Sequence, residues 1–452
     1  MVFQNKAELI YVVRKWNIHH NREIVVTQSK PGYWQAYCRT ISSDYKGPQE
    51  RYHCCWSVSV STNPDTIVVF ENEPEIEEGF DTFKFVFWAF GPAIKAYKLC
   101  IPIICIDGTH LKGSYRGKLL TAIGKNANNQ IIPVAFALVD EESNESWVWF
   151  LKILQENVVR KGKLCVIYDR YPVLHAMSAQ MYGWEHRYCL RHIRSNLLSK
   201  YTKVKSLKQL CWIVGSITNQ ILYKNSLRAI KQASTEAWKY LHDADLGKWT
   251  VYKDKERSRW GNTTTNIVES LNSVLRHARM MLIKACIEYT FDYTRQHFYD
   301  QSRDGRQCNS PLSKNMFNIF NEREKRAQRY KTTCYNEQQG VFKVQSTYQR
   351  SGEGGTDYIA EFKQKRCSCG IWQHQRLPCS HAISVCSHLN EDINKCISKK
   401  YITPRWREQY SHHFNPLRDA SYWAHIQWNI MADPSRLIKY RGRKNQNVLR
   451  TR

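Results

Sequence analysis

Hydrophobic positions in the first part of the chain follow the short patterns of a small mixed module. Residues 5–21 have helical periodicity, while residues 22–29, 33–40 and 65–71 are short runs rich in apolar and β-branched side chains, typical of strands. The pattern predicts an α+β module over residues 1–72.

A more continuous hydrophobic pattern follows. Residues 100–107 form an unbroken apolar run of strand length, typical of a buried central strand. Residues 118–126, 130–140 and 163–169 predict three further strands, and the amphipathic stretch 145–159 predicts a helix. Three strands, a helix and another strand predict an α/β fold, in which helices cover a mixed sheet.

Helical periodicity marks the segments on either side of this block. We expect residues 83–98 to be helical, as well as most of residues 172–300. The longest periodic stretch is 266–301, for which Asn266 is a candidate N-cap.

Chain length and net charge indicate how many domains the protein has and what kind of partner it binds. The chain has 452 residues, which predicts two to four domains. Its formal charge is +27, from 67 Lys and Arg against 40 Asp and Glu, and a surplus of this size favours a polyanionic partner such as nucleic acid. A basic protein with a well-solvated surface is the alternative.

The longest apolar runs indicate that the protein does not enter a membrane. They have about half the length needed to span a bilayer, and the first residues lack the apolar core of a signal peptide. We therefore expect a soluble intracellular protein. Its sixteen cysteines are then expected to be thiols and metal ligands rather than disulfides.

Carboxylates stand at two strand ends of the hydrophobic block. Asp107 ends the first central strand and precedes Gly108, and Asp169 ends the last strand. Ligands gather at the carboxyl ends of strands in such sheets, and two neighbouring carboxylates suit Mg²⁺. Glu269 is the natural third carboxylate for a two-metal site. Each residue alone is more often a turn former, a cap or a partner of a helix dipole.

A compact cysteine and histidine motif lies near the end of the chain. Cys367, Cys369, Cys379 and His381 follow the pattern Cys-x-Cys, nine residues, Cys-x-His. Three thiolates and one imidazole are a common ligand set for structural zinc. The alternative is a group of buried cysteines with a helix-capping histidine.

Several of these motifs together resemble a known family. The stretch "IDGTHLKGSYRGKLLTAIGKNANNQIIPVAFALVDEESNESWVWFL", followed in order by "YDR", "HRYCLRHIRSNL" and "NIVESLN", resembles the transposase domain of Mutator-like transposons and of their domesticated relatives, the far-red-impaired-response factors. The resemblance covers residues 85–300. It implies a ribonuclease-H-like fold with a helical insertion, and a triad of Asp107, Asp169 and Glu269 that binds Mg²⁺ or Mn²⁺.

The cysteine motif resembles the SWIM zinc finger of the same family. The resemblance implies a ββα finger over residues 355–392 that binds DNA or protein. Residues 301–354 are then a connector of helix and loop, and residues 393–452 are a basic, partly disordered tail. Cys189 and His192 match the family's Cys-x-x-His element. Two residues cannot complete a tetrahedral zinc site, so either they join ligands elsewhere or, as we favour, they pack and hydrogen-bond.

The module at residues 1–72 resembles half of a WRKY or GCM type DNA-binding finger. Cys38, Cys54 and Cys55 match the first half of that metal site. No His or Cys occurs between Cys55 and Cys100, so the second half is missing and the module is degenerate.

These observations define competing functions. The first is a nuclear transposase that binds double-stranded DNA, uses structural Zn²⁺, and cleaves and transfers strands with Mg²⁺ or Mn²⁺. The second is a transposase-derived regulator that binds DNA without cutting it. A third is a zinc-stabilised module that binds protein partners. Homo-oligomers are compatible with each function, and no membrane is expected to be involved.

Overall fold

The computed structural model divides the chain into two units, each described here by itself. The first comprises Met1–Cys54 with Ala424–Trp428, and the second comprises Cys55–Trp423 with Asn429–Arg452. The residues that the structure describes are 23–30, 33–39, 62–74, 81–112, 116–159, 163–169, 173, 183–254, 258–276, 278–280, 283–346, 357–416 and 430–432.

One hairpin is described in the first unit. β1 (Glu23–Lys30) pairs antiparallel with β2 (Tyr33–Arg39), and both coincide with strands expected from the sequence. The side chain of Cys38, and the whole of Cys54 and Cys55, lie outside the described residues. The expected half-finger therefore stays a prediction.

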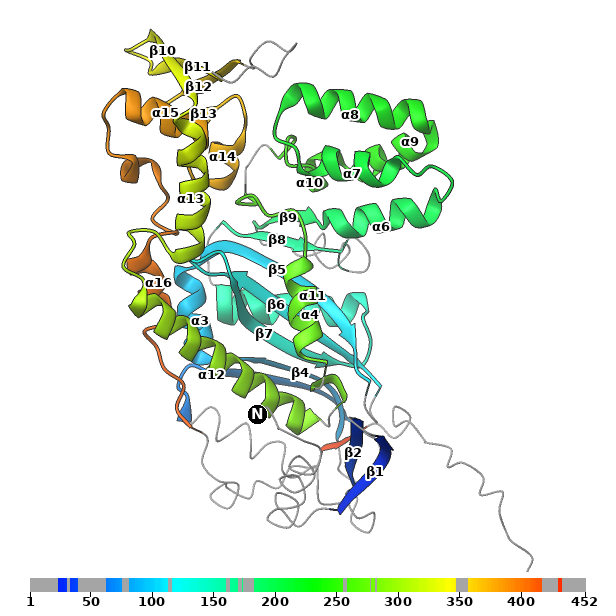
Figure 1. Ribbon diagram of the computed structural model, residues 1–452. Coiled ribbons are helices and arrows are strands. Elements are labelled where there is room, and N and C mark those ends of the chain that lie inside the picture. The colour runs from blue at the N-terminus through cyan, green and yellow to red at the C-terminus, as the bar shows by residue number, and fades with distance from the viewer. Residues whose placement is uncertain are drawn as a thin grey trace, which may run out of the picture. The chain divides into compact units, whose positions relative to one another are not determined.

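A mixed sheet of eight strands organises the second unit (Figure 1). Its strand order is β14-β4-β7-β6-β5-β8-β9, and β3 pairs with the other edge of β4. The strands are β3 (Ile67–Pro74), β4 (Asp81–Ala89), β5 (Ile101–His110), β6 (Lys118–Lys125), β7 (Ile131–Val139), β8 (Cys165–Tyr168), β9 (Glu185–Tyr188) and β14 (Ile430–Ala432).

The strands in the middle of the sheet pair partly antiparallel and partly parallel. β5, β6 and β7 form an antiparallel meander, whereas β8 and β9 add to the other side of β5 in parallel. β5 and β6 are buried on both faces, which explains why their sequences are continuous apolar runs rather than alternating ones. The expected mixed α/β fold is thus confirmed.

Two strands differ from the sequence expectation. Residues 83–98, expected to be helical, form most of strand β4 and then helix α3 (Gly91–Leu99), which Pro92 helps to start. A short apolar run in a strand buried on both faces has no periodicity that separates it from a buried helix. β3, expected in the N-terminal module, pairs with β4 in the large sheet.

Helices cover both faces of the sheet at β4. Phe87 packs on Phe150 of α4 (Asn144–Ile153), while the indole of Trp88 donates a hydrogen bond to Thr290 of α12 (Ile283–Gln307) on the opposite face. Figure 1 shows α12 in front of the sheet and α4 behind it. α4 continues as the π-helical η1 (Leu154–Val159).

Five helices, which we call the helical insertion, follow β9. They are α6 (Leu190–Lys200), α7 (Leu207–Ser216), α8 (Gln220–Ala233), α9 (Thr235–Asp243) and α10 (Leu246–Trp249).

The expected long helix over residues 266–301 is broken. It forms α11 (Asn266–Val274), the short turn η2 (Ala278–Met280) and then α12. Thr265, not Asn266, is the N-cap residue of α11. The break coincides with a tertiary contact, because the Arg279 carbonyl accepts a hydrogen bond from the Lys112 amide at 2.7 Å.

A four-stranded antiparallel sheet underlies the zinc-finger region. Its order is β10-β11-β12-β13, with β10 (Tyr330–Asn336) and β11 (Val341–Ser346) inside the segment expected to be helix and loop. The remaining elements are α13 (Lys314–Ala327), β12 (Asp357–Glu361), β13 (Arg366–Cys367), α14 (Ile371–Gln375), α15 (Ser380–His388), η3 (Ile393–Cys396) and α16 (Thr403–Gln409).

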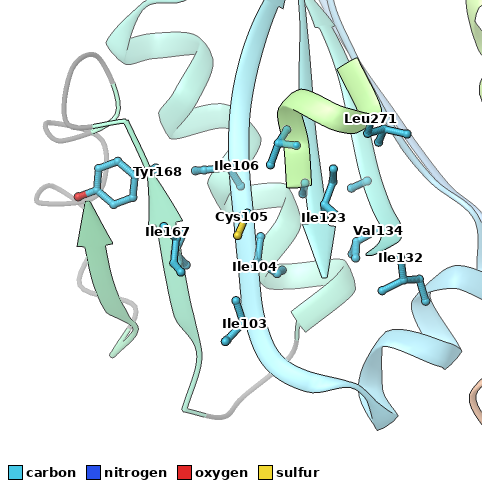
Figure 2. Packing of buried hydrophobic residues seen from close by; sticks show 14 of the residues in the cluster. Ile103, Ile104, Cys105, Ile106, Ile123, Ile132, Val134, Ile167, Tyr168 and Leu271 are labelled. Carbon is cyan, nitrogen blue, oxygen red and sulfur yellow. The ribbon is translucent and has the colours of Figure 1, made fainter. Parts of the chain in front are cut away.

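β5 lies at the centre of the main core. Figure 2 shows Ile104, Cys105 and Ile106 of β5 among the buried side chains, with Ile167 on the neighbouring β8 and Leu271 contributed by α11. Burying an isoleucine side chain fully contributes about 1.5–3 kcal/mol. This packing fixes the position of the strand that carries Asp107. None of the described helices has the length and apolar character needed to cross a bilayer.

The chain returns to the large sheet after the finger. Gln409 of α16 accepts a hydrogen bond from the Ala127 amide at 2.9 Å, and the Tyr410 hydroxyl accepts one from Asn126 at 2.8 Å. Asn126 also donates to Gln301 of α12 at 2.8 Å. Hydrogen bonds therefore hold the turn between β6 and β7 to α12, which precedes the finger in the chain, and to the end of α16, which follows it.

Candidate metal centres

The sheet register brings Asp107 and Asp169 to the same face. Cys105 of β5 is paired with Ile167 of the parallel strand β8. Asp107 and Asp169 each lie two residues further along, and side chains two residues apart point to the same face of a sheet. Neighbouring strands are about 4.8 Å apart, so this register predicts that the two half-buried carboxylates lie close to each other.

The segment from Thr264 to η2 covers this face of β5. The Cys105 thiol lies 4.0 Å from the Thr264 carbonyl, and the Asn272 amide of α11 donates to Asp107 Oδ2 at 3.3 Å. Arg279 then donates a hydrogen bond to the hydroxyl of Thr109. Cys105, Asp107 and Thr109 alternate along the strand, so α11 and η2 run over the face that carries Asp107.

Glu269 lies on the helix that covers the two aspartates. It stands three residues before Asn272, a spacing that places two residues on one face of a helix. Its side chain lies outside the described residues, so convergence of the three carboxylates stays a prediction. Sequence reasoning missed Asn272, although its spacing from Glu269 was a usable signal.

Cys189 and His192 form a hydrogen-bonded pair beside the aspartates. The hydrogen bond with Cys189 raises the pKa of His192 to about 9 against the effect of burial, and the charges of Asp169 and Asp107 add to this rise. Burial raises the pKa of Cys189, but hydrogen bonds from His192 and Thr265 outweigh it and lower the pKa overall. The two pKa values are therefore shifted in opposite directions by the same hydrogen bond.

The sulfur of Cys189 also anchors the start of α11. Its Sγ accepts hydrogen bonds from the amide and the hydroxyl of Thr265, both at 3.3 Å. The Leu190 amide donates to the Thr263 carbonyl at 2.9 Å. These contacts support the reading of Cys189 and His192 as a packed, hydrogen-bonded pair.

The four cysteine and histidine residues of the finger gather around one point. The ligand atoms of Cys367, Cys369, Cys379 and His381 all lie within 4.8 Å of one another, and all four residues are buried. No other group of this kind occurs among the described residues. Hydrogen bonds from Cys367 and Cys369 hold the pKa of Cys379 well below its usual value, so this sulfur is poised as a thiolate. The donor set fits a closed, tetrahedral structural zinc ion.

Local elements position the four ligands. Cys367 ends β13, and Gly370 follows Cys369 with a φ of 80°, a conformation that favours glycine. Cys379 caps α15 by accepting a hydrogen bond from the Ala382 amide at 3.4 Å. His381 in the first turn of α15 stacks on Tyr358 of β12, with ring centroids 3.8 Å apart.

The segment that carries the four proposed zinc ligands, residues 367–381, is called the ligand loop. It is contacted directly by the connection between α7 and α8 of the helical insertion and by α13. Thr218 donates a hydrogen bond to the Cys369 carbonyl at 2.6 Å, and a Cβ at Gly370 would lie 2.5 Å from the Thr218 side chain. Arg323 of α13 donates to the carbonyls of Leu377 and Pro378 at 3.1 and 2.9 Å. Sequence reasoning missed Thr218 and Arg323, because no local pattern marks contacts of this range.

Comparison with known protein families identifies two domains in the chain. Residues 103–196 match the MULE transposase domain, and residues 353–390 match the SWIM zinc finger. The first match includes Asp107 and Asp169. The chain therefore carries a MULE transposase domain followed by a SWIM zinc finger, which confirms the resemblance found in the sequence.

Its curated relatives are FAR1-related sequence proteins of Arabidopsis thaliana. Protein FAR1-RELATED SEQUENCE 12 is 22% identical over 78% of this chain and 48% of its own length. Protein FAR1-RELATED SEQUENCE 7 is 24% identical over 78% of this chain and 50% of its own. Protein FAR1-RELATED SEQUENCE 6 is 22% identical over 72% and 51%. The chain spans about half the length of these relatives.

Proposed function

We propose that this protein binds double-stranded DNA in the nucleus and cuts it with divalent cations held by Asp107, Asp169 and Glu269. The observation that carries the proposal is the register of β5 and β8, which supports a shared site for the two aspartates. The order β7-β6-β5-β8-β9, antiparallel and then parallel, supports a ribonuclease-H-like fold.

The chain's own residues suit this chemistry. Carboxylate oxygens are the ligands that Mg²⁺ and Mn²⁺ prefer, and a bound ion would activate water and offset charge on a phosphodiester. The amide of Asn272 holds one oxygen of Asp107 and thereby orients that carboxylate. We also infer that the finger holds one structural zinc ion through Cys367, Cys369, Cys379 and His381.

The helical insertion supplies a surface for nucleic acid. Lys and Arg outnumber Asp and Glu in it, and several of these cations lie over aromatic rings. The Arg194 guanidinium is 5.0 Å from the centre of the Trp212 ring, and the Lys231 ammonium is 5.0 Å from that of Trp238. Cations beside partly exposed aromatic rings contact both phosphates and bases in nucleic-acid-binding proteins.

Nicking of labelled duplex DNA tests the proposal. The purified protein with Mn²⁺ should nick the duplex, and Asp169→Asn should lower the rate at least about a hundredfold, since the ion loses a ligand. Asp140→Asn, the same change after β7, serves as the control and should keep the wild-type rate. Equal nicking by Asp169→Asn and the wild type would show that the aspartates do not hold the catalytic ion.

A second candidate is a regulator that binds DNA without cutting it. The observation in its favour is the set of cations over aromatic rings in the helical insertion, which needs no metal ion to contact nucleic acid. Tight binding of DNA by a protein that neither takes up Mn²⁺ nor nicks would favour this candidate. An interaction with other proteins through the finger would be compatible with either.

A further inference from the structure

Basic side chains surround the end of β5 beyond Asp107. His110 ends the strand and Lys112 follows it, Arg116 lies across the hairpin, and Arg276 and Arg279 come from the segment between α11 and α12. All are exposed except Arg279, which is half-buried. We call these five residues the basic strip.

Arg279 is fixed against β5 at a defined distance from the aspartates. Its guanidinium donates hydrogen bonds to the Thr109 hydroxyl and, at 3.5 Å, to the His110 carbonyl. Thr109 lies two residues beyond Asp107 on the same face of the strand, which corresponds to about 7 Å. The cation therefore stands one side-chain position away from the proposed metal site.

The charge of Arg279 lacks an anionic counterpart in the described part of the chain. Burial and the like charge of Arg276 both lower the pKa of Arg279, and no described carboxylate opposes them. The Nε of Arg279 is buried without a hydrogen-bond partner among the described residues. An anion bound beside the guanidinium would offset this cost.

We propose that Arg279, with Arg276 and Lys112 of the basic strip, binds the phosphodiester adjacent to the one held at Asp107 and Asp169. The inference rests on the proposed function and adds the path of the DNA backbone along β5. The guanidinium nitrogen that is not bonded to β5 can donate to a phosphate oxygen, whereas a contact of this kind reads no base. Binding at the strip should therefore be independent of DNA sequence.

The salt dependence of DNA binding tests the role of Arg279. Arg279→Gln should reduce the slope of log affinity against log salt by about 0.9, the value of one lost phosphate contact. Affinity at physiological salt should fall about tenfold for unrelated duplexes alike. Arg303→Gln is the control, because Arg303 is an exposed residue of α12 about 30 Å along the helix from its start. Equal slopes for the two variants would overturn the inference.

A second measurement uses the unsubstituted protein, in case Arg279→Gln does not fold. Duplex DNA should protect Arg279, but not Arg303, from modification by phenylglyoxal, as measured by mass spectrometry of the full chain. Equal modification of Arg279 with and without DNA would overturn the inference.

Manganese binding without DNA separates this inference from the proposed function. Arg279→Gln should bind Mn²⁺ like the wild type, whereas Asp107→Asn should not. A wild type that binds DNA, with Arg279 unprotected, would refute the phosphate contact alone. A wild type that binds neither DNA nor Mn²⁺ would refute both.

Discussion

The zinc finger and the proposed carboxylate site on the large sheet illustrate two ways of building a metal site. In the finger, Cys367 and His381 are only 14 positions apart, and all four ligands are buried. On the large sheet, Asp107 and its partner Asn272 are 165 positions apart, and Asp107 is half-buried. A short segment that buries little apolar surface depends on its ion, whereas a site placed on a packed sheet is held in position by the fold.

The finger is nevertheless not independent of the large sheet. Leu377 and Ile383 belong to the same buried cluster as the residues of β5. Thr218 and Arg323 hold the ligand loop from outside the finger, and α16 returns the chain to the turn after β6. Loss of order in the finger should therefore weaken contacts well beyond it.

The largest expected effect is that of removing zinc. Cys379→Ser should abolish zinc retention, and because zinc binding supplies on the order of 10 kcal/mol to such a site, the finger should unfold. Its contacts with Thr218 and Arg323 should then be lost, and the thermal unfolding midpoint of the remaining protein should fall. Zinc content and circular dichroism measure the two effects. Cys386→Ser, which changes a buried cysteine outside the ligand set, should keep the zinc.

A finger that keeps its fold after chelation would contradict the statement that this short segment depends on its ion. Loss of the finger without any change in the unfolding midpoint of the large sheet would show instead that its contacts with Thr218 and Arg323 contribute nothing.

A smaller effect concerns a buried histidine of α12. Burial lowers the pKa of His297 on α12 to about 4. A histidine depressed from about 6.5 must stay neutral in the folded state, so its contribution is complete above pH 6.5 and is lost as the pH falls towards 4. The free energy of unfolding should fall by about 2 kcal/mol between pH 7 and pH 5 from this group. His297→Gln should remove this part of the pH dependence of the free energy of unfolding, as measured by urea unfolding at pH 7 and pH 5.

The exposed His388 provides the control for this prediction. His388→Gln should retain the pH dependence of the wild type. If His297→Gln also retains the wild-type pH dependence, another group governs acid unfolding, and burial does not lower the pKa of His297 as the structure indicates.

The sequence predicted what is encoded locally. The ligand set of the finger and strands β5 to β8 follow from spacing and from apolar runs, because both depend on neighbouring residues. β4 was mistaken for helix, since a strand buried on both faces shows no alternation. β9, with the polar sequence EHRY, is stabilised by parallel pairing with β8, which no local pattern reveals.

The parts of the carboxylate site that were missed depend on tertiary contacts. Asn272 and Arg279 become recognisable only when α11 and η2 are placed over β5. The break between α11 and α12 contains no proline or glycine to predict it. It coincides with the hydrogen bond between the Lys112 amide and the Arg279 carbonyl.

Metal content of the wild type and of Asp107→Asn tests the account most directly. After equilibration with Mn²⁺, the wild type should contain one tightly held zinc ion and exchangeable manganese, counted by elemental analysis and electron paramagnetic resonance. Asp107→Asn should keep the zinc and a free energy of unfolding within about 1 kcal/mol of the wild type, but lose the manganese. Manganese binding that is unchanged in Asp107→Asn, or zinc that is lost with it, would contradict the existence of two separate metal centres.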